Sequence, residues 1–226
     1  LKGDELTVLA FTDGNTVEIM PPARDYKRLM DNNKGPNTGG MGAFAPVNVS
    51  KKELKYIKER ILIPVIDGMK EEGIKYKGVL YAGLIKTSQG YKVLEFNCRF
   101  GDPEAQVILP LLKTDLMDII EAVIDEKLDK IKIRWRNKSV ITVVLASGGY
   151  PLKYEKLLRI NGLRSIKDTR TIIFHAGTIV QNNVCLTNGG RVLNVTAIAN
   201  SFKKARTIAY NTIKSIYFKN MDYRKD

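Results

Sequence analysis

The chain has 226 residues, of which 44% are hydrophobic, and its formal net charge is +13. This length allows one large domain or two small ones, with a core that needs no disulfide or metal to fold. Two cysteines are too few for a disulfide framework, which favours a reducing compartment and a cytoplasmic location. No apolar run approaches the roughly 20 residues that span a bilayer, so we expect no membrane partner. Leu1 already looks like part of a strand, so we expect the natural N-terminus to lie upstream of it.

The 37 basic residues outnumber the 24 acidic ones, but they are scattered along the chain. There is no long basic run and no strand in which basic and aromatic residues alternate. This pattern favours a solvated, lysine-rich surface, and we expect no nucleic-acid partner. Some of the basic residues could instead bind small molecules that carry phosphate groups.

The first half of the chain reads as strands around one long helix. A turn at Asp13-Gly14 predicts a hairpin, and an apolar stripe over residues 51–72 predicts a helix that ends at Gly73. Residues 21–46 are rich in glycine and proline and predict a long loop, which in a compact domain is usually functional or disordered. The predicted strands of this half are residues 4–11, 16–20, 79–86 and 92–99.

The second half predicts shorter elements. Residues 126–137 are polar and predict a linker, and Asn200 is a candidate N-cap for a helix over residues 201–216. The remaining helices are predicted at residues 104–112 and 115–124, and the strands at residues 140–145, 171–175, 178–180 and 191–197. Together these elements predict an α/β (α+β) fold in two units, residues 1–128 and 129–226.

A row of polar residues ends the strand at 92–99. Side chains two apart share a strand face, so Glu95, Asn97 and Arg99 are expected to point the same way, and Cys98 the other way. Carboxylate and amide oxygens suit Mg²⁺ held between a protein and nucleotide phosphates, and a guanidinium stabilises charge that builds during phosphoryl transfer. The alternative is a strand edge with solvated polar residues.

A glycine-rich segment lies at residues 34–43. Its glycines allow backbone N–H groups to approach a ligand closely and to form an anion site. It is neither a Walker A loop nor a dinucleotide fingerprint, and a structural turn is the alternative. The charged residues 24–28 just before it could clamp a phosphate or form a solvated cluster, and the single histidine, His175, is expected to be structural.

Three of these stretches together resemble the phosphoribosylamine–glycine ligase family of ATP-grasp enzymes. The segment Arg-Phe-Gly-Asp-Pro-Glu-Ala-Gln at residues 99–106 looks like the family signature, and Pro-Asn-Thr-Gly-Gly-Met-Gly-Ala at residues 36–43 and Val-Leu-Glu-Phe-Asn at residues 93–97 match further family motifs. The other matching stretches are residues 3–5, 174–178, 189–193 and 223–226. The resemblance covers essentially the whole chain, and its motifs are long and specific.

The resemblance implies the C-terminal portion of an ATP-grasp domain, residues 1–128, followed by a small C-terminal α/β domain, residues 129–226. It implies ATP-dependent ligation of glycine to 5-phosphoribosylamine through a glycyl phosphate, with ADP and phosphate as the other products. In this interpretation Glu95 and Asn97 bind Mg²⁺ or Mn²⁺, and Arg99 and Asp102 are catalytic. The implied substrate-binding residues are Asp25, Lys27, Asn37, Thr38, Gly39, Gly40, Gly42 and Arg191.

The chain departs from the family pattern in two respects. Arg24 and Tyr26 stand where members commonly have Gln and His, which puts the substrate contacts at these positions in doubt. The N-terminal part of the family, with its ATP-contacting lysine, is missing, so we expect the chain to need that part as a partner and to be inactive alone. The parent could be a single-function ligase or a multifunctional purine-pathway protein. The alternatives are another ATP-grasp ligase or carboxylase, and a basic nucleic-acid-binding module.

Overall fold

The computed structural model describes all 226 residues, which divide into two compact units. The first unit comprises Leu1–Arg24 and Ala45–Asn137, and the second comprises Asp25–Phe44 and Lys138–Asp226. The predicted boundary near residue 128 therefore has a counterpart at Asn137, but the segment Asp25–Phe44 packs with the second unit. Compact units need not coincide with evolutionary domains, so the division into residues 1–128 and 129–226 stays a prediction.

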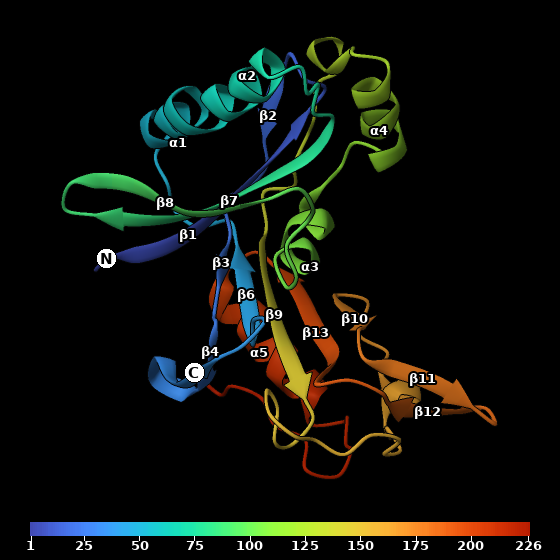
Figure 1. Cartoon of the computed structure of the whole chain (residues 1–226). Coiled ribbons are helices and arrows are strands. Elements are labelled where there is room, and N and C mark those ends of the chain that lie inside the picture. The colour runs from blue at the N-terminus through green and yellow to red at the C-terminus, as the bar shows by residue number, and fades with distance from the viewer. The chain divides into compact units, whose positions relative to one another are not determined.

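The first unit is built on an antiparallel sheet with strand order β2-β1-β7-β8 (Figure 1). Its strands are β1 (Asp4–Thr12), β2 (Val17–Ile19), β7 (Gly78–Thr87) and β8 (Gly90–Asn97). Alternate residues of β1 and β7, among them Val8 and Leu84, are fully buried against helix residues such as Ile57 and Leu62. The opposite face of the same strands carries Thr7, Leu9, Tyr81 and Ile85, because successive side chains of a strand point to opposite faces.

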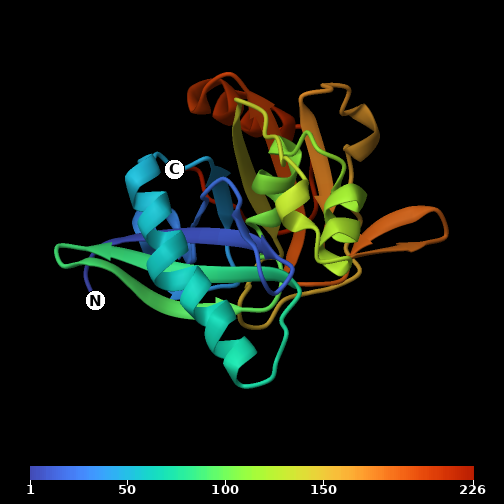
Figure 2. The same cartoon turned by 90° about the horizontal axis from the view of Figure 1, so that it is seen from above.

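One long helical segment covers the apolar face of this sheet, as Figure 2 shows. It consists of α1 (Lys51–Ile57), a π-helical turn (Lys58–Leu62) and α2 (Ile63–Glu71). Ser50 begins it with a capping box: its hydroxyl accepts from the Glu53 N–H, and the Glu53 carboxylate accepts from the Ser50 N–H. Gly73, at a φ of +81°, follows its end, so the predicted helix at residues 51–72 is confirmed.

Short helices follow β8 in the first unit. They are α3 (Ala105–Ile108), a 3₁₀ turn (Leu109–Leu111), α4 (Leu116–Ile124) and a second 3₁₀ turn (Leu128–Lys130). The predicted linker at residues 126–137 thus begins with a helical turn, and Leu128 is buried. No helix of the chain is both long and apolar enough to cross a membrane.

The second unit is built on a five-stranded sheet with order β10-β13-β9-β6-β3. Its strands are β3 (Arg24–Asp25), β6 (Gly42–Ala45), β9 (Ser139–Ala146), β10 (Thr171–His175) and β13 (Arg191–Ala199). Helix α5 (Phe202–Ile213) covers one face, where Ile208 and Ile213 pack on Val195 and Leu145. Two hairpins complete the unit, β4 (Arg28–Met30) with β5 (Lys34–Asn37), and β11 (Thr178–Gln181) with β12 (Val184–Thr187).

The structure corrects three details of the sequence prediction. Residues 21–46 are not a plain loop but hold four short strands and a 3₁₀ turn. Strand β4 pairs with β5 and β3 pairs with β6 inside this segment, and β6 also pairs with the distant β9. Ser201, not Asn200, caps α5: the Ser201 hydroxyl accepts from the Lys204 N–H, whereas the Asn200 side chain accepts from Lys138. Strand β12 was not predicted at all.

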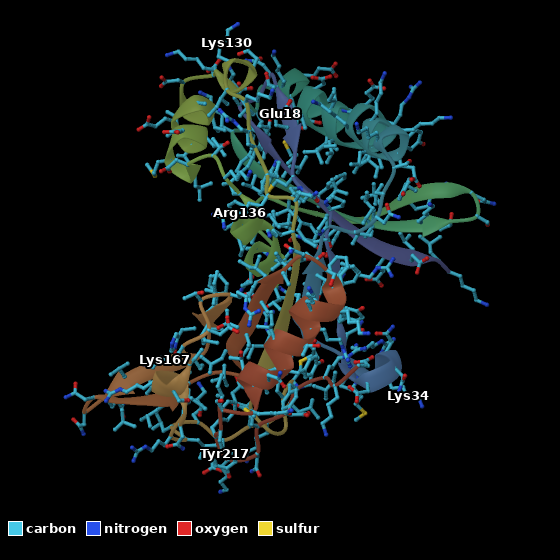
Figure 3. All side chains as sticks on the ribbon, turned by 180° about the vertical axis from the view of Figure 1, so that it is seen from behind. Glu18, Lys34, Lys130, Arg136, Lys167 and Tyr217 are labelled. Atoms are coloured by element: carbon cyan, nitrogen blue, oxygen red, sulfur yellow. The ribbon has the colours of Figure 1, made fainter.

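The charged residues lie mainly on the surface. Figure 3 labels Lys130 of the first unit and Lys34 and Lys167 of the second, which come from separate parts of the chain, and all three are exposed. The described surface therefore agrees with scattered, solvated lysines.

Candidate active site

The first set of candidate residues lies on the first unit's sheet. Glu95 pairs with Gly83 and Asn97 pairs with Tyr81 across β7 and β8. Directly paired residues of antiparallel strands point to the same face, so Glu95 and Asn97 share a face with Tyr81, as predicted for the first two. This is the face opposite the one that α1 and α2 cover.

A β-bulge shapes this strand next to the candidate ligands. Gly83 pairs with Glu95 but Leu84 pairs with Val93, so Leu94 is the extra residue. Bulges bend a strand locally and redirect a side chain, and they are frequent beside active sites. Here the bulge directly precedes Glu95 in the chain.

Gly83 makes room for the Glu95 side chain. A Cβ at Gly83 would lie 3.0 Å from Cγ of Glu95 and 3.4 Å from the ring of Tyr81. Any larger residue at this position would therefore push the carboxylate or the ring aside. The absence of a side chain lets Glu95 lie over the strand beside Tyr81.

The donor set fits a divalent cation that is shared with a nucleotide. Glu95 is exposed, Asn97 is half-buried, and both offer oxygen ligands on one face. No group of three or more His, Cys, Asp or Glu residues in the chain could hold a metal by itself. Mg²⁺ suits such an incomplete set, because it usually binds one or two carboxylates and takes its other ligands from phosphates and water.

A buried hydrogen-bond cluster supports the same face. The Glu104 side chain is only 2% exposed, and its Oε1 accepts from the hydroxyls of Tyr81 at 2.9 Å and Thr7 at 3.1 Å. Gly101 approaches it so closely that a Cβ there would lie 2.3 Å from Oε2 of Glu104. Thr7 pairs with Gly83, so the cluster lies on the face that carries Glu95.

Sequence reasoning did not assign a role to these supporting residues. Thr7 and Tyr81 are polar positions inside otherwise apolar strands, and this is the signal that could have pointed to them. A polar residue buried in a strand needs a partner, since an unpaired buried hydroxyl is costly.

Arg99 and Asp102 lie beyond the strand. Strand β8 ends at Asn97, so the alternation that was expected to align Arg99 with Glu95 and Asn97 does not reach it. The Arg99 Nη1 donates to the Phe100 carbonyl oxygen at 2.8 Å, and the Phe100 ring packs edge-on against Phe11 at 6.2 Å. The catalytic roles of Arg99 and Asp102 stay predictions.

The second set of candidate residues lies in the second unit, where Arg191 contacts the glycine-rich loop. Nη1 of Arg191 donates to the carbonyl oxygen of Gly39 at 2.7 Å and to that of Gly40 at 3.5 Å. The Gly39 N–H donates to the Tyr150 hydroxyl at 2.9 Å. The structure therefore brings together residues 39, 40 and 191, which were predicted to bind substrate, and adds Tyr150, which was not predicted.

The glycines of this loop are needed for close packing. A Cβ at Gly39 would lie 3.2 Å from the Arg191 guanidinium, and one at Gly42 would lie 2.8 Å from the Thr142 carbonyl oxygen. Gly40 has a φ of +111°, a conformation that side chains disfavour. The structural reason for these glycines is thus the approach of an arginine and a strand.

The backbone N–H groups of the loop already have partners. The N–H of Thr38 donates to the Lys27 carbonyl, that of Gly40 to the Thr38 hydroxyl and that of Met41 to the Tyr26 carbonyl, at 2.8–3.0 Å. The N–H of Gly39 is taken by Tyr150, as described above. The expected cradle of free N–H groups is therefore absent at positions 38–41, and any anion there would meet other groups of the loop.

Tyr26 points away from its two charged neighbours. Its N–H donates to the Gly42 carbonyl of β6 and its carbonyl accepts from the Met41 N–H, so the chain is extended here, and Tyr26 faces opposite Asp25 and Lys27. Its ring contacts Phe44 and lies 4.8 Å from the Arg224 guanidinium. The replacement of the family's usual His by Tyr26 therefore concerns the packing of the second unit.

Two family models match the chain, one in each half. The family model described as phosphoribosylglycinamide synthetase, ATP-grasp (A) domain, matches residues 1–105, and that of the phosphoribosylglycinamide synthetase C domain matches residues 140–226. The chain belongs to the phosphoribosylglycinamide synthetase family. The predicted resemblance and the predicted α/β ATP-grasp fold are thereby confirmed.

Members of this family are similar over the whole of the chain. A phosphoribosylamine–glycine ligase from Caldanaerobacter subterraneus is 50% identical, covering 100% of this chain and 54% of that protein. A trifunctional purine biosynthetic protein adenosine-3 from Gallus gallus is 52% identical, covering 100% of this chain and 23% of that protein. The chain thus spans about half the length of the first relative and less of the second.

A solved structure gives the same result. The crystal structure of phosphoribosylamine–glycine ligase from Thermotoga maritima matches with a TM-score of 0.90 at 35% identity. The match covers 100% of this chain and 56% of that one.

Proposed function

We propose that the chain is the C-terminal part of a phosphoribosylamine–glycine ligase. The observation that carries the proposal is the match of both family models, one to each half of the chain, with 50% identity to a ligase of that name. Relatives of this chain are longer, so the complete reaction is assigned to the extended protein.

The proposed reaction has two steps. The glycine carboxylate oxygen attacks the γ-phosphorus of ATP, which forms glycyl phosphate and releases ADP. The amine of 5-phosphoribosylamine then attacks the acyl carbon, loses a proton and expels phosphate, which leaves the amide. Positioning and electrostatic stabilisation carry most of the rate in such phosphoryl transfers.

The sheet face of the first unit that carries Glu95 and Asn97 serves the nucleotide side in this proposal. Glu95 and Asn97 would hold Mg²⁺ or Mn²⁺, which when bound neutralises charge on the ATP phosphates. Arg99 stabilises the negative charge of the acyl-phosphate stage, and Asp102 assists from the same turn. Tyr81 and Glu104 hold the strand and the following turn in place beneath these groups.

The glycine-rich loop of the second unit serves the substrate side. We propose that Asp25, Lys27 and the loop residues Asn37, Thr38, Gly39, Gly40 and Gly42 bind the small substrates together with Arg191. Supporting this, Arg191 already contacts the loop, and the Lys27 carbonyl anchors Thr38 through its N–H and its hydroxyl, each at 2.8 Å. Lys27 and Arg191 supply positive charge for a phosphate. We expect the enzyme to act in the cytoplasm.

A coupled assay of ADP release tests the proposal. The protein extended upstream to the length of its relatives should release ADP only when both glycine and 5-phosphoribosylamine are present. The 226-residue chain alone should show no turnover. Activity with bicarbonate or formate in place of glycine would instead assign another ATP-grasp reaction, and glycine-dependent turnover by the isolated chain would contradict the expected need for the upstream part.

A further inference from the structure

A cavity in the second unit shares only Gly42 with the residues that the proposed ligase reaction uses. It has a volume of about 310 Å³ and lies between residues from the Asp25–Phe44 segment, β9, α5 and the C-terminal tail. Cavities of this size are at the small end of those that hold ligands, and a largely apolar one with a few polar groups is the usual place to expect one.

Aromatic rings form one side of this cavity. Tyr26 and Phe44 lie with ring centres 6.1 Å apart, and Phe202 meets Phe44 edge-on at 5.2 Å. Phe202 is 36% exposed, so part of an apolar ring faces solvent although a neighbouring ring is within contact distance. Rings in offset or edge-on arrangements attract one another, so this wall suits a further planar ring.

The polar side of the cavity is cationic. Arg224 is 5% exposed and holds the Asp226 carboxylate, so the one acidic side chain of the lining is neutralised. Arg206 uses Nε and Nη2 on the carbonyl oxygens of Asp226 and Lys225, at 3.3 and 2.8 Å. Its Nη1 has no hydrogen-bond partner in the structure. The lining thus keeps guanidinium N–H donors that no protein group uses.

We propose that this cavity is a binding site for a small aromatic anion, a planar ring that carries one carboxylate or phosphate group. The ring stacks among Tyr26, Phe44 and Phe202, and the anion accepts from Nη1 of Arg206. The proposal does not depend on the ligase reaction, and it gives the second unit a ligand that is neither glycine nor 5-phosphoribosylamine.

Nuclear magnetic resonance titration of the ¹⁵N-labelled 226-residue chain tests this directly. The probes are benzoate, its neutral analogue benzamide, and adenosine 5′-monophosphate. Benzoate should shift the amides of the cavity residues with a dissociation constant of about 1 mM, a value usual for so small a ligand. Benzamide should bind about tenfold more weakly, since it lacks the charge that strengthens a hydrogen bond.

Variants separate the ring site from general anion binding. Arg206→Met should weaken benzoate about tenfold, whereas Lys203→Met, which removes one exposed charge from the same helix outside the cavity, should leave it unchanged. Arg206 also holds the tail, so Phe202→Leu is the second variant, and it should weaken benzoate while the tail contacts remain. Arg206→Lys should recover part of the affinity.

The outcomes decide the proposal in each case. Tighter binding of adenosine 5′-monophosphate than of benzoate assigns the anion to phosphate, and the reverse assigns it to carboxylate. No amide shifts with either anion, equal binding of benzoate and benzamide, or equal effects of Arg206→Met and Lys203→Met would overturn it.

Discussion

In the first unit the candidate ligands Glu95 and Asn97 stand on a single strand, whereas in the second unit the glycine-rich loop is held by Tyr150 and Arg191, which are 111 and 152 positions from Gly39. The first set owes its arrangement to strand alternation and can be altered one side chain at a time. The second owes its arrangement to long-range hydrogen bonds with backbone groups. Substitutions in the first site should therefore lower activity with little loss of stability. Substitutions in the second site should mainly destabilise the local conformation of the loop.

The largest expected effect is a loss of activity at the first site while the first unit stays folded. Glu95→Ala in the ligase extended to full length should lower metal-dependent ADP formation by at least about 100-fold, because one of two protein ligands is lost. Glu95 is exposed, so the melting temperature should hardly change. Near-normal ADP release in this variant would remove the metal assignment.

The next effect concerns the buried support of the same face. Glu104→Ala should lower the free energy of unfolding of the 226-residue chain by about 2–3 kcal/mol, because the buried hydroxyls of Tyr81 and Thr7 lose their shared acceptor. Urea denaturation measures this. Glu121→Ala is the matched control, an exposed glutamate of the same unit whose loss should cost less than about 0.5 kcal/mol. Equal losses in both variants would mean that the cluster contributes nothing to stability.

A smaller effect is expected for the hydrogen bond between Tyr150 and the glycine-rich loop of the second unit. Tyr150→Phe removes only the hydroxyl that accepts from Gly39, so we expect a loss of about 1 kcal/mol of local stability. Amide hydrogen exchange should be about fivefold faster at Gly39, and unchanged at Val8 in the core of the first unit. Uniform acceleration at both residues would instead indicate global destabilisation.

These results also show what the sequence could predict. Strands, the helix at residues 51–72 and the shared face of Glu95 and Asn97 follow from periodicity, which is a local property, and all of them are present. Other contacts join residues far apart in the chain. Gly39 forms hydrogen bonds with Tyr150 and Arg191, and the Glu104 carboxylate accepts from the Tyr81 and Thr7 hydroxyls. No local pattern contains that information. For the same reason the N–H groups of the loop were expected to be available, although the fold uses them.

The smallest expected effect is a pH dependence in the second unit. Hydrogen bonds from the Arg224 side chain lower the pKa of Asp226 to about 2 from its ordinary value of 3.8. Because the folded pKa lies below the unfolded one, this pair stabilises the unit fully above pH 3.8, and the contribution is lost as the pH falls towards 2. Comparing Asp226→Asn with the unaltered chain by thermal unfolding should show a difference above pH 4 that disappears near pH 2. A difference that stays constant over this range would contradict the assignment.

The account rests most directly on the oxygen donors of β8. Electron paramagnetic resonance of Mn²⁺ with ADP, recorded on the full-length ligase, measures whether these donors hold the ion. The unaltered protein should bind Mn²⁺ with the nucleotide, and Glu95→Gln should weaken that binding by about 10–100-fold, while Glu121→Gln leaves it unchanged. Equal Mn²⁺ binding by Glu95→Gln and the unaltered protein would contradict the account.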